Sequence, residues 1–251
     1  MQRYFIELSY KGTAYSGFQV QENANTVQQE VSRALEVLYR QPFSLSGSSR
    51  TDSGVHAYQN YFHFDSELAI PASAAYNLNA ILPPDITVKG IFAVPAGAHC
   101  RFDAVAREYR YYVYAKKDPF MADRGWLYSY PLDAELLQAA AAVVMEYTDF
   151  TSFAKRNTQV KTYMCTIVQS EWVISGNSYV YHVRANRFLR GMVRGLVATM
   201  LKVGRGQMTI DELREVILAK DNTRADFSAP PQGLFLLGVR YEGELAGVLG
   251  Q

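Results

Sequence analysis

The segment Tyr4–Tyr10 reads YFIELSY, and together with the segment after it this stretch decides the fold. Tyr4, Ile6, Leu8 and Tyr10 alternate with Phe5, Glu7 and Ser9. This period of two predicts a β-strand. The next segment predicts a helix, because apolar residues recur on one face: Val27, Val31, Leu35 and Leu38. Thr26 and Gln29 are spaced as a capping box at the start of this helix. A strand followed by an amphipathic helix indicates a mixed fold.

The rest of the first half continues this pattern. A short strand at 43–45 leads into a polar, glycine-containing loop. The elements predicted after it are a strand at 59–64, a helix at 71–81 and a strand at 86–94. The order β-α-β-β-α-β is typical of the split-βαβ or ferredoxin-like unit.

The second half predicts the same order of elements. They are a strand at 109–115, a helix at 132–146, strands at 165–174 and 179–185 joined by a Gly176–Asn177 turn, helices at 188–203 and 209–219, and a strand at 234–241. The two halves show no visible sequence similarity, so the repeat is one of architecture only.

The predicted fold class is therefore α+β, with two ferredoxin-like lobes. We expect an N-terminal lobe at 1–104 and a C-terminal lobe at 105–251, without a Pro- or Gly-rich linker between them. The absence of a linker suggests a continuous, mainly antiparallel sheet or a tight junction, with helices on one side. A central cleft between the lobes is then the expected place for a site.

Composition describes an ordinary globular chain of 251 residues with a formal net charge of +1. Charge is uneven, however: nine Lys or Arg and a single acid, Glu171, fall between Lys155 and Arg205. A local excess of this kind can attract phosphates although the whole chain is nearly neutral. Two cysteines cannot form a disulfide framework, and neither a bilayer-spanning run nor a secretory leader is evident. We expect a cytoplasmic protein.

The strongest chemical signal is the segment 47–57, GSSRTDSGVHA, which lies between two predicted strands. In a polar loop of this kind, the ordinary role of an aspartate such as Asp52 is to cap the backbone amides of its neighbours. Arg50 is only two residues away, and an adjacent guanidinium favours the ionised carboxylate that a nucleophile or base requires. No other residue completes a triad around His56, so we interpret that histidine as structural. The four His and two Cys show no metal-ligand spacing.

The Arg-Thr-Asp-x-Gly-Val-His pattern of this loop resembles the signature of the tRNA pseudouridine synthase A family. The resemblance extends over nearly the whole chain, through segments that read YKGTAYSGFQ at 10–19, NAILPPDI at 79–86, REYRY at 107–111, DFTSF at 149–153, FLRGMVR at 188–194 and GLFL at 233–236. Departures from the family pattern occur at Lys11, Phe18, Ser49 and Ser53. The first two bear on contacts with tRNA, and the last two change the loop without removing a reactive group.

The resemblance implies roles for particular residues. Asp52 matches the essential aspartate, Tyr109 the tyrosine that stacks on the target uracil, and Arg194 the arginine that pairs with the aspartate. Arg50 matches an arginine linked to expelling the target base from its stack. The resemblance further implies a cofactor-free isomerase that forms pseudouridine on the 3′ side of the tRNA anticodon stem-loop, and a homodimer that contacts tRNA with both subunits.

Arg187, Arg190 and Arg194 are spaced so that they would share one face of the predicted 188–203 helix region. A solvated basic face is the ordinary interpretation of such a pattern. No acid lies between Asn186 and Arg205, so contacts with RNA phosphates are a natural use for these side chains.

Two other functions stay open at the level of sequence. The first is a binding module that holds RNA on two sheets without reacting, which explains the basic and aromatic content but not the Arg-Thr-Asp loop. The second is an active isomerase that modifies an RNA other than tRNA.

Overall fold

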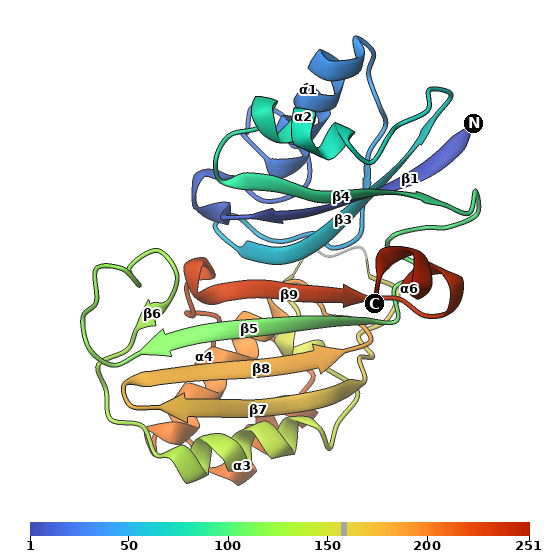
Figure 1. Cartoon of the computed structure of the whole chain (residues 1–251). Helices are drawn as coiled ribbons and strands as arrows, with labels where there is room; N and C mark the ends of the chain where they lie inside the picture. Colours follow the sequence, from blue (N-terminus) through green and yellow to red (C-terminus); the bar gives the residue numbers. More distant parts are fainter. Residues whose placement is uncertain (157–159) are drawn as a thin grey trace. The chain divides into compact units, whose positions relative to one another are not determined.

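The computed structural model describes residues 1–156 and 160–251, and these fall into two compact units. Unit 1 comprises Met1–Ala106 and Leu236–Gln251, and unit 2 comprises Arg107–Phe235. The chain therefore leaves unit 1, forms unit 2, and returns with its last residues to unit 1 (Figure 1).

Unit 1 is built around antiparallel strands in the order β4-β1-β3, with the short β2 also pairing with β3. Its elements are β1 Gln2–Tyr10, α1 Val27–Tyr39, β2 Ser46–Gly47, β3 His56–Ser66, α2 Ala74–Ile81, β4 Ile86–Val94, most of β9 Leu234–Arg240, and α6 Gly243–Leu249. A short 3₁₀ turn, Gly12–Ala14, follows β1. Helices α1 and α2 lie on one side of the strands (Figure 1).

The core of unit 1 forms between these helices and the sheet. Apolar side chains of α1 at the predicted positions Val27, Val31 and Leu35 are buried. They cover a face of strand residues that includes Phe62 and Phe64, each at most 1% exposed. Thr26 begins α1 as predicted, because its side chain accepts a hydrogen bond from the amide of Gln29 at 3.3 Å.

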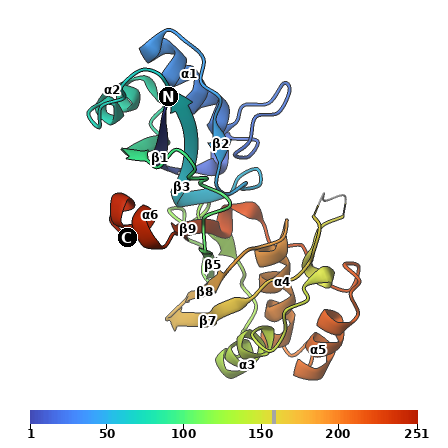
Figure 2. The same ribbon diagram turned by 90° about the vertical axis from the view of Figure 1, so that its right-hand side faces the viewer.

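Unit 2 contains the antiparallel order β5-β8-β7, with β6 parallel to β5. Its elements are β5 Ala106–Tyr114, β6 Trp126–Leu127, α3 Ala134–Val144, β7 Ile167–Ser175, β8 Ser178–Ala185, α4 Met192–Gly204 and α5 Ile210–Leu218, with 3₁₀ turns at Thr151–Phe153 and Pro231–Gly233. Figure 2 shows α3, α4 and α5 on one side of β7 and β8. The α+β class and the mainly antiparallel strands are confirmed.

One face of β5 is packed into the core. Tyr109, Tyr111 and Val113 are all buried, at 8%, 0% and 1% exposure. The hydroxyl of Tyr111 donates to the carbonyl of Pro230 at 2.7 Å, so the buried phenol has a polar partner. For Tyr111, and likewise for the fully buried Tyr61 and Tyr181, core packing accounts for the tyrosine.

The turn predicted at Gly176–Asn177 is confirmed, with Gly176 at a φ of +56° between β7 and β8. Several element boundaries differ from the prediction. The short strand predicted at 43–45 forms instead at Ser46–Gly47, where the backbone pairs with β3. The helix predicted from residue 71 begins at Ala74, because residues 71–76 form successive i→i+3 turns. Helix α6 was not predicted, since it is only seven residues long and contains two glycines.

The helix predicted at 188–203 begins instead at Met192, which changes the interpretation of its arginines. Gly191 precedes the helix with a φ of +76°, a left-handed conformation that ends any helical run before it. Arg187 and Arg190 therefore lie in the segment between β8 and α4, and only Arg194 lies on the helix. The expectation that the three share one helical face is wrong.

Candidate active site

Asp52 lies in the loop that joins β2 to β3 and is half-buried. The carbonyl of Asp52 accepts a hydrogen bond from the amide of Val55 at 3.2 Å, which closes a tight turn. Gly54 supplies the left-handed residue of this turn, with a φ of +76°. The carboxylate is thus carried by a short, sharply bent segment.

The segment that begins at the last residue of β1 holds this loop at Thr51, the residue before the aspartate. The hydroxyls of Tyr10 and Thr51 lie 2.7 Å apart, and both side chains are buried. The carbonyl of Thr51 accepts from the amide of Phe18 at 3.1 Å. Asn60 of β3 adds a third connection, donating to the Tyr10 hydroxyl at 3.2 Å and to the carbonyl of Ser49 at 2.8 Å. The segment thus contacts Thr51 at two points, and β3 supports both Tyr10 and the neighbouring Ser49.

The same segment also holds the loop on the other side of Asp52. The carbonyl of Tyr15 accepts from the amide of Gly54 at 3.3 Å and from the hydroxyl of Ser53 at 3.2 Å. The amide of Gly12 donates to Nδ1 of His56 at 3.0 Å. His56 is 1% exposed, so the structure supports the structural role expected for it. We call residues 10–18 the opening segment.

Two glycines of the opening segment allow it to approach the loop this closely. A Cβ on Gly12 would lie 2.0 Å from the carbonyl oxygen of Val55. Gly17 has a φ of +103°, and a Cβ there would lie 3.1 Å from the carbonyl oxygen of Thr51. Both positions require glycine, the first because of space and the second also because of backbone conformation.

The NAILPPDI segment in turn supports the opening segment. The amide of Lys11 donates to the carbonyl of Asp85 at 2.9 Å, and the hydroxyl of Tyr15 donates to the Asp85 carboxylate at 2.5 Å. Asn79 exchanges two hydrogen bonds of 2.8 Å with the backbone of Val88. Burial first, and then the Asp85 partner, raises the pKa of Tyr15, so its phenol remains a donor at neutral pH. Sequence reasoning identified these residues as a motif but assigned them no supporting role.

Arg50 also belongs to this loop and is exposed. It and Asp52 are the two sequence-predicted site residues of unit 1, separated by one residue along the chain. Tyr109, Arg187, Arg190 and Arg194 lie in unit 2.

Tyr109 is the fourth residue of β5 and lies opposite Val183 of β8. Its ring is 8% exposed and meets the ring of Phe188 edge to face, with centroids 5.0 Å apart and planes at 83°. This contact places the 186–191 segment, which carries Arg187 and Arg190, beside Tyr109. Unit 2 therefore brings the predicted stacking residue and two predicted phosphate-binding residues into one neighbourhood.

Arg194 lies in the first turn of α4 and is half-buried. Its Nε donates to the carbonyl of Ala229 at 2.6 Å, which orients the side chain toward the segment before β9. Most of the other α4 residues are buried, including Val193, Leu196 and Val197. Arg194 is thus an anchored guanidinium on a buried helix, unlike the exposed Arg190.

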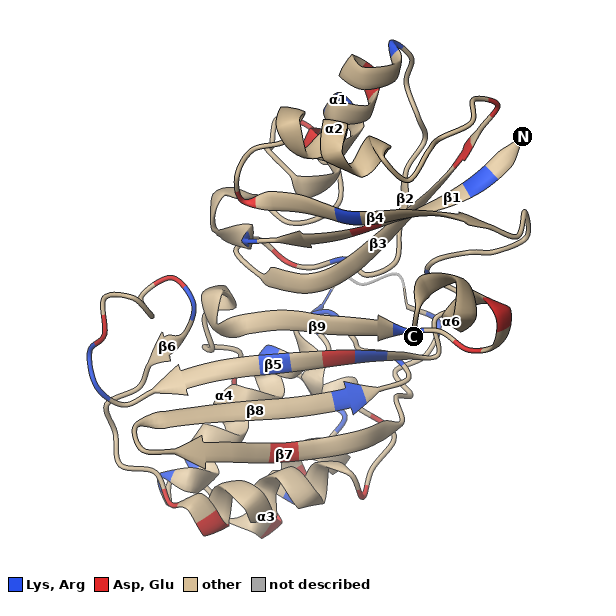
Figure 3. Cartoon of the chain, in the orientation of Figure 1, with Lys and Arg blue, Asp and Glu red and all other residues tan. Residues whose placement is uncertain are grey.

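Arginines lie on β5 and β8 of unit 2, and β5 also carries an acidic residue (Figure 3). Cys165 lies near Arg187 and is 1% exposed. Burial raises the pKa of the Cys165 thiol to about 11, and the nearby Arg187 charge opposes this shift only in part. Cys165 is therefore a protonated thiol at neutral pH and a poor nucleophile.

One cluster of possible metal ligands appears only in the folded chain. Donor atoms of His63, His99 and Cys100 lie within 4.8 Å of one another, a set suited to a soft divalent cation. These donors already bond within the protein: Nδ1 of His63 and Sγ of Cys100 are 3.1 Å apart, and the thiol donates to the carbonyl of Ser46 at 3.2 Å. Nδ1 of His99 accepts from the amide of Arg101 at 3.2 Å. We interpret the cluster as support for the 99–103 turn.

Within the described residues, no helix combines the length and the apolar character needed to cross a bilayer.

Comparison with known proteins agrees with these motifs. The family model described as tRNA pseudouridine synthase matches residues 8–103 and 147–242. tRNA pseudouridine synthase A of Parabacteroides distasonis is 47% identical over 247 residues, which cover 98% of each chain. The protein of that name from Bacteroides thetaiotaomicron is 44% identical and covers 98% of this chain and 93% of its own. Its Staphylococcus aureus counterpart is 38% identical, with coverage of 93% and 90%.

We expect Gly12→Ala to destabilise unit 1, because its Cβ would overlap the Val55 carbonyl and displace the loop that carries Asp52. The free energy of unfolding, measured in urea, should fall by about 1–3 kcal/mol, as for other overpacked sites. Gly97→Ala is the matched control, since a Cβ at Gly97 meets no atom within 4 Å. Equal stability of the two variants would contradict this account of the loop.

We also expect His63 to make stability depend on pH. Burial first, and then the charges of His99 and Arg3, lowers the pKa of His63 from 6.5 to about 4. The unfolded chain binds this proton at a higher pH than the folded one, so stability is lost as pH falls from about 6.5 toward 4. The contribution of His63 between pH 7 and pH 5 should be about 1–2 kcal/mol.

The measurement is urea unfolding of the wild type and His63→Gln at both pH values. The variant should lose less stability than the wild type on acidification. If both lose the same amount, His63 does not titrate in this way.

Proposed function

We propose that this chain, which belongs to the tRNA pseudouridine synthase family, isomerises uridine to pseudouridine in tRNA. The observation that carries the proposal is the Asp52 loop. It presents the family's essential residue type on a turn held from both sides by the opening segment. A loop whose backbone is held by so many contacts suits chemistry that requires accurate placement of its side chain.

The reaction breaks the bond between N1 of uracil and C1′ of the ribose. The base then turns, a bond forms between C5 and C1′, and the hydrogen of C5 leaves as a proton while N1 gains one. Reactant and product are isomers, so the balance needs neither an oxidant nor a reductant. The protein must extrude the base, hold it as it turns, and stabilise the changing charge.

Asp52 is the proposed catalytic carboxylate. It would attack the uridine at C6 of the base or at C1′ of the sugar, or assist formation of a glycal intermediate. Arg50 is proposed to help expel the target base from its stack, because an exposed guanidinium on the same loop can enter the space that the base leaves.

Unit 2 is proposed to supply the remaining groups. Tyr109 would stack on the uracil, a contact that typically contributes about 1–3 kcal/mol per base. Arg194 would pair with Asp52, and its hydrogen bond to Ala229 supports a fixed orientation for the guanidinium. Arg187 and Arg190 would contact phosphates. This division of labour makes the N-terminal lobe the carrier of the aspartate and the C-terminal lobe the carrier of the tyrosine and arginine.

The proposed substrate region is the 3′ side of the anticodon stem-loop. We further propose that the protein works in the cytoplasm as a homodimer in which one tRNA contacts both subunits. These points rest on the family resemblance of the motifs. An RNA-binding module without activity is the competing function, favoured only by the basic and aromatic content of unit 2.

Release of tritium distinguishes the two functions. tRNA labelled at C5 of uridine should lose its label to water on incubation with the wild-type chain, because the new bond replaces C5–H. We expect Asp52→Asn to abolish the release and to leave tRNA binding within about threefold, since the amide is nearly isosteric but cannot act as a nucleophile. Asp211→Asn, at an exposed position on α5, is the control. Appreciable release by Asp52→Asn would refute the catalytic assignment, and none by the wild type would refute the activity.

We expect Tyr109→Leu to reduce turnover by about 5- to 150-fold, the range that loss of a stacking contact allows. Tyr109→Phe keeps the ring and should retain most of the activity. Label release and thermal unfolding should be measured on both variants. A stability loss in Tyr109→Leu large enough to account for the lost activity would identify the tyrosine as a core residue instead.

A further inference from the structure

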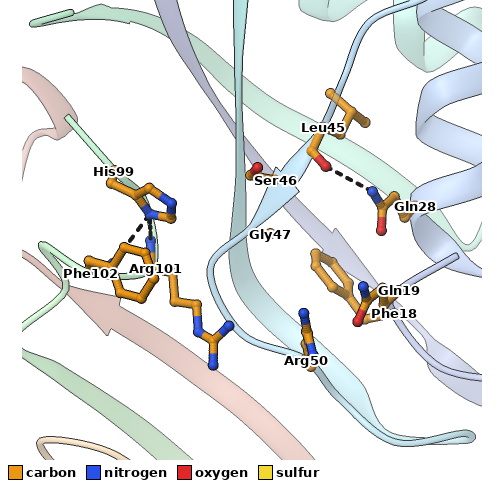
Figure 4. A pocket seen from close by; sticks show the side chains of 10 residues that line it. All are labelled: Phe18, Gln19, Gln28, Leu45, Ser46, Gly47, Arg50, His99, Arg101 and Phe102. Carbon is orange, nitrogen blue, oxygen red and sulfur yellow. Dashed lines mark hydrogen bonds between the residues drawn. The ribbon is translucent and has the colours of Figure 1, made fainter. Parts of the chain in front are cut away.

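A cavity of about 180 Å³ opens within unit 1 beside the Asp52 loop. Figure 4 shows that its lining comes from separate parts of the chain, among them Phe18 and the adjacent Gln19, Arg50 of the loop, and the 99–102 turn. We call it the Phe102 pocket. Its volume is below the roughly 300–1,000 Å³ of typical small-molecule sites, so it suits one part of a larger ligand.

The lining of the Phe102 pocket is basic and contains no acidic side chain. Its charged residues are Arg50 and Arg101, and the amides of Gln19 and Gln28 add neutral donors and acceptors. Two guanidinium groups that line one cavity favour an anion, and arginine matches the geometry of phosphate oxygens. The charge of the pocket therefore fits a phosphate group.

Phe102 gives the pocket an aromatic surface. Its side chain is 74% exposed, which is unusual for a phenylalanine. The His99 ring supports it, with centroids 4.2 Å apart, and the Arg101 guanidinium lies 5.7 Å from its centroid. An aromatic ring that is supported on one side and exposed overall is a surface on which a nucleic-acid base can stack.

The turn that carries Phe102 is well braced. The amide of His99 donates to the Asp103 carboxylate at 2.7 Å, and Nδ1 of His99 accepts from the amides of Arg101 and Phe102 at 3.2 and 3.4 Å. These bonds hold Arg101 and Phe102 as a unit before any ligand arrives. The side of the pocket formed by β2 is also closely packed. A Cβ on Gly47 would lie 2.4 Å from the Phe18 ring.

Arg50 connects the Phe102 pocket to the chemistry, because it lines the pocket and is two residues from Asp52 on the same loop. We propose that the Phe102 pocket binds a nucleotide of the substrate RNA other than the target uridine, with its base against Phe102 and its phosphate near Arg50 and Arg101. This inference rests on the proposed function, and it adds a site that the sequence motifs did not indicate. The pocket would hold the RNA strand in register while the target base turns.

The first test compares Phe102→Ala with Tyr76→Ala in the full-length protein. Tyr76 is a matched control, because it is an aromatic residue of the same unit with 81% exposure and lies on α2, away from the pocket lining. Phe102→Ala should raise KM for tRNA in the label-release assay by about 5- to 150-fold, with kcat within about threefold of wild type. Tyr76→Ala should leave both constants unchanged. A KM for Phe102→Ala equal to that of the control would overturn the proposal, and so would a fall in kcat alone.

The second test measures the charge contribution. Arg101→Gln should weaken tRNA binding and reduce the slope of log Kd against log salt by about one, as expected for loss of one phosphate contact. Arg33→Gln, on α1 with an ion pair to Glu30, is the control and should leave the slope unchanged. An unchanged slope for Arg101→Gln would overturn the phosphate assignment.

Two further measurements separate this proposal from its alternatives. If Phe102→Ala changes the molecular mass in solution while its Kd for tRNA stays at the wild-type value, the surface is an interface between two copies and the proposal fails.

The Kd for tRNA is also measured independently of turnover. If the wild type releases no label yet binds tRNA, the proposed function fails, and the Kd of Phe102→Ala still decides the pocket: a Kd increased at least fivefold supports it, and an unchanged Kd overturns it.

Discussion

The structure of the candidate site depends on the close contact between the opening segment and the loop that carries Asp52. Backbone groups on both sides of the aspartate bond to this segment, and the Tyr10 hydroxyl contacts Thr51 from the core. The contact is possible only because Gly12 and Gly17 have no side chain. A short bent loop would otherwise sample many conformations, and the entropy of fixing it is offset by these hydrogen bonds.

This arrangement explains why motifs that carry no reactive group accompany the aspartate. The segment at 79–86 holds the opening segment through Asp85, and the opening segment holds the loop. The loop is therefore supported by two successive sets of polar contacts, both within unit 1. A group that must meet a reacting atom accurately benefits from such support, because small displacements are costly in catalysis.

Unit 2 follows a different principle, in which buried apolar packing positions polar groups. Tyr109 is on the buried face of β5, and Arg194 extends from a helix whose other residues are mostly in the core. The left-handed backbone conformation of Gly191, just before the helix, separates Arg194 from Arg187 and Arg190. The helix can thus present one anchored guanidinium, while the segment before it carries the two others beside Tyr109.

The sequence by itself determined the order of strands and helices, the α+β class, the turn at Gly176 and the loop on which Asp52 lies. It could do so because periodicity, caps and glycine positions are local properties of the chain. Only the tertiary structure decided that the helix after β8 begins at Met192, that the last residues return to unit 1, and that Arg50, Phe18 and Phe102 line one cavity. The helix start follows from the left-handed backbone of Gly191. The other two features depend on contacts between residues far apart in sequence, and no local pattern records which distant segments will pack together.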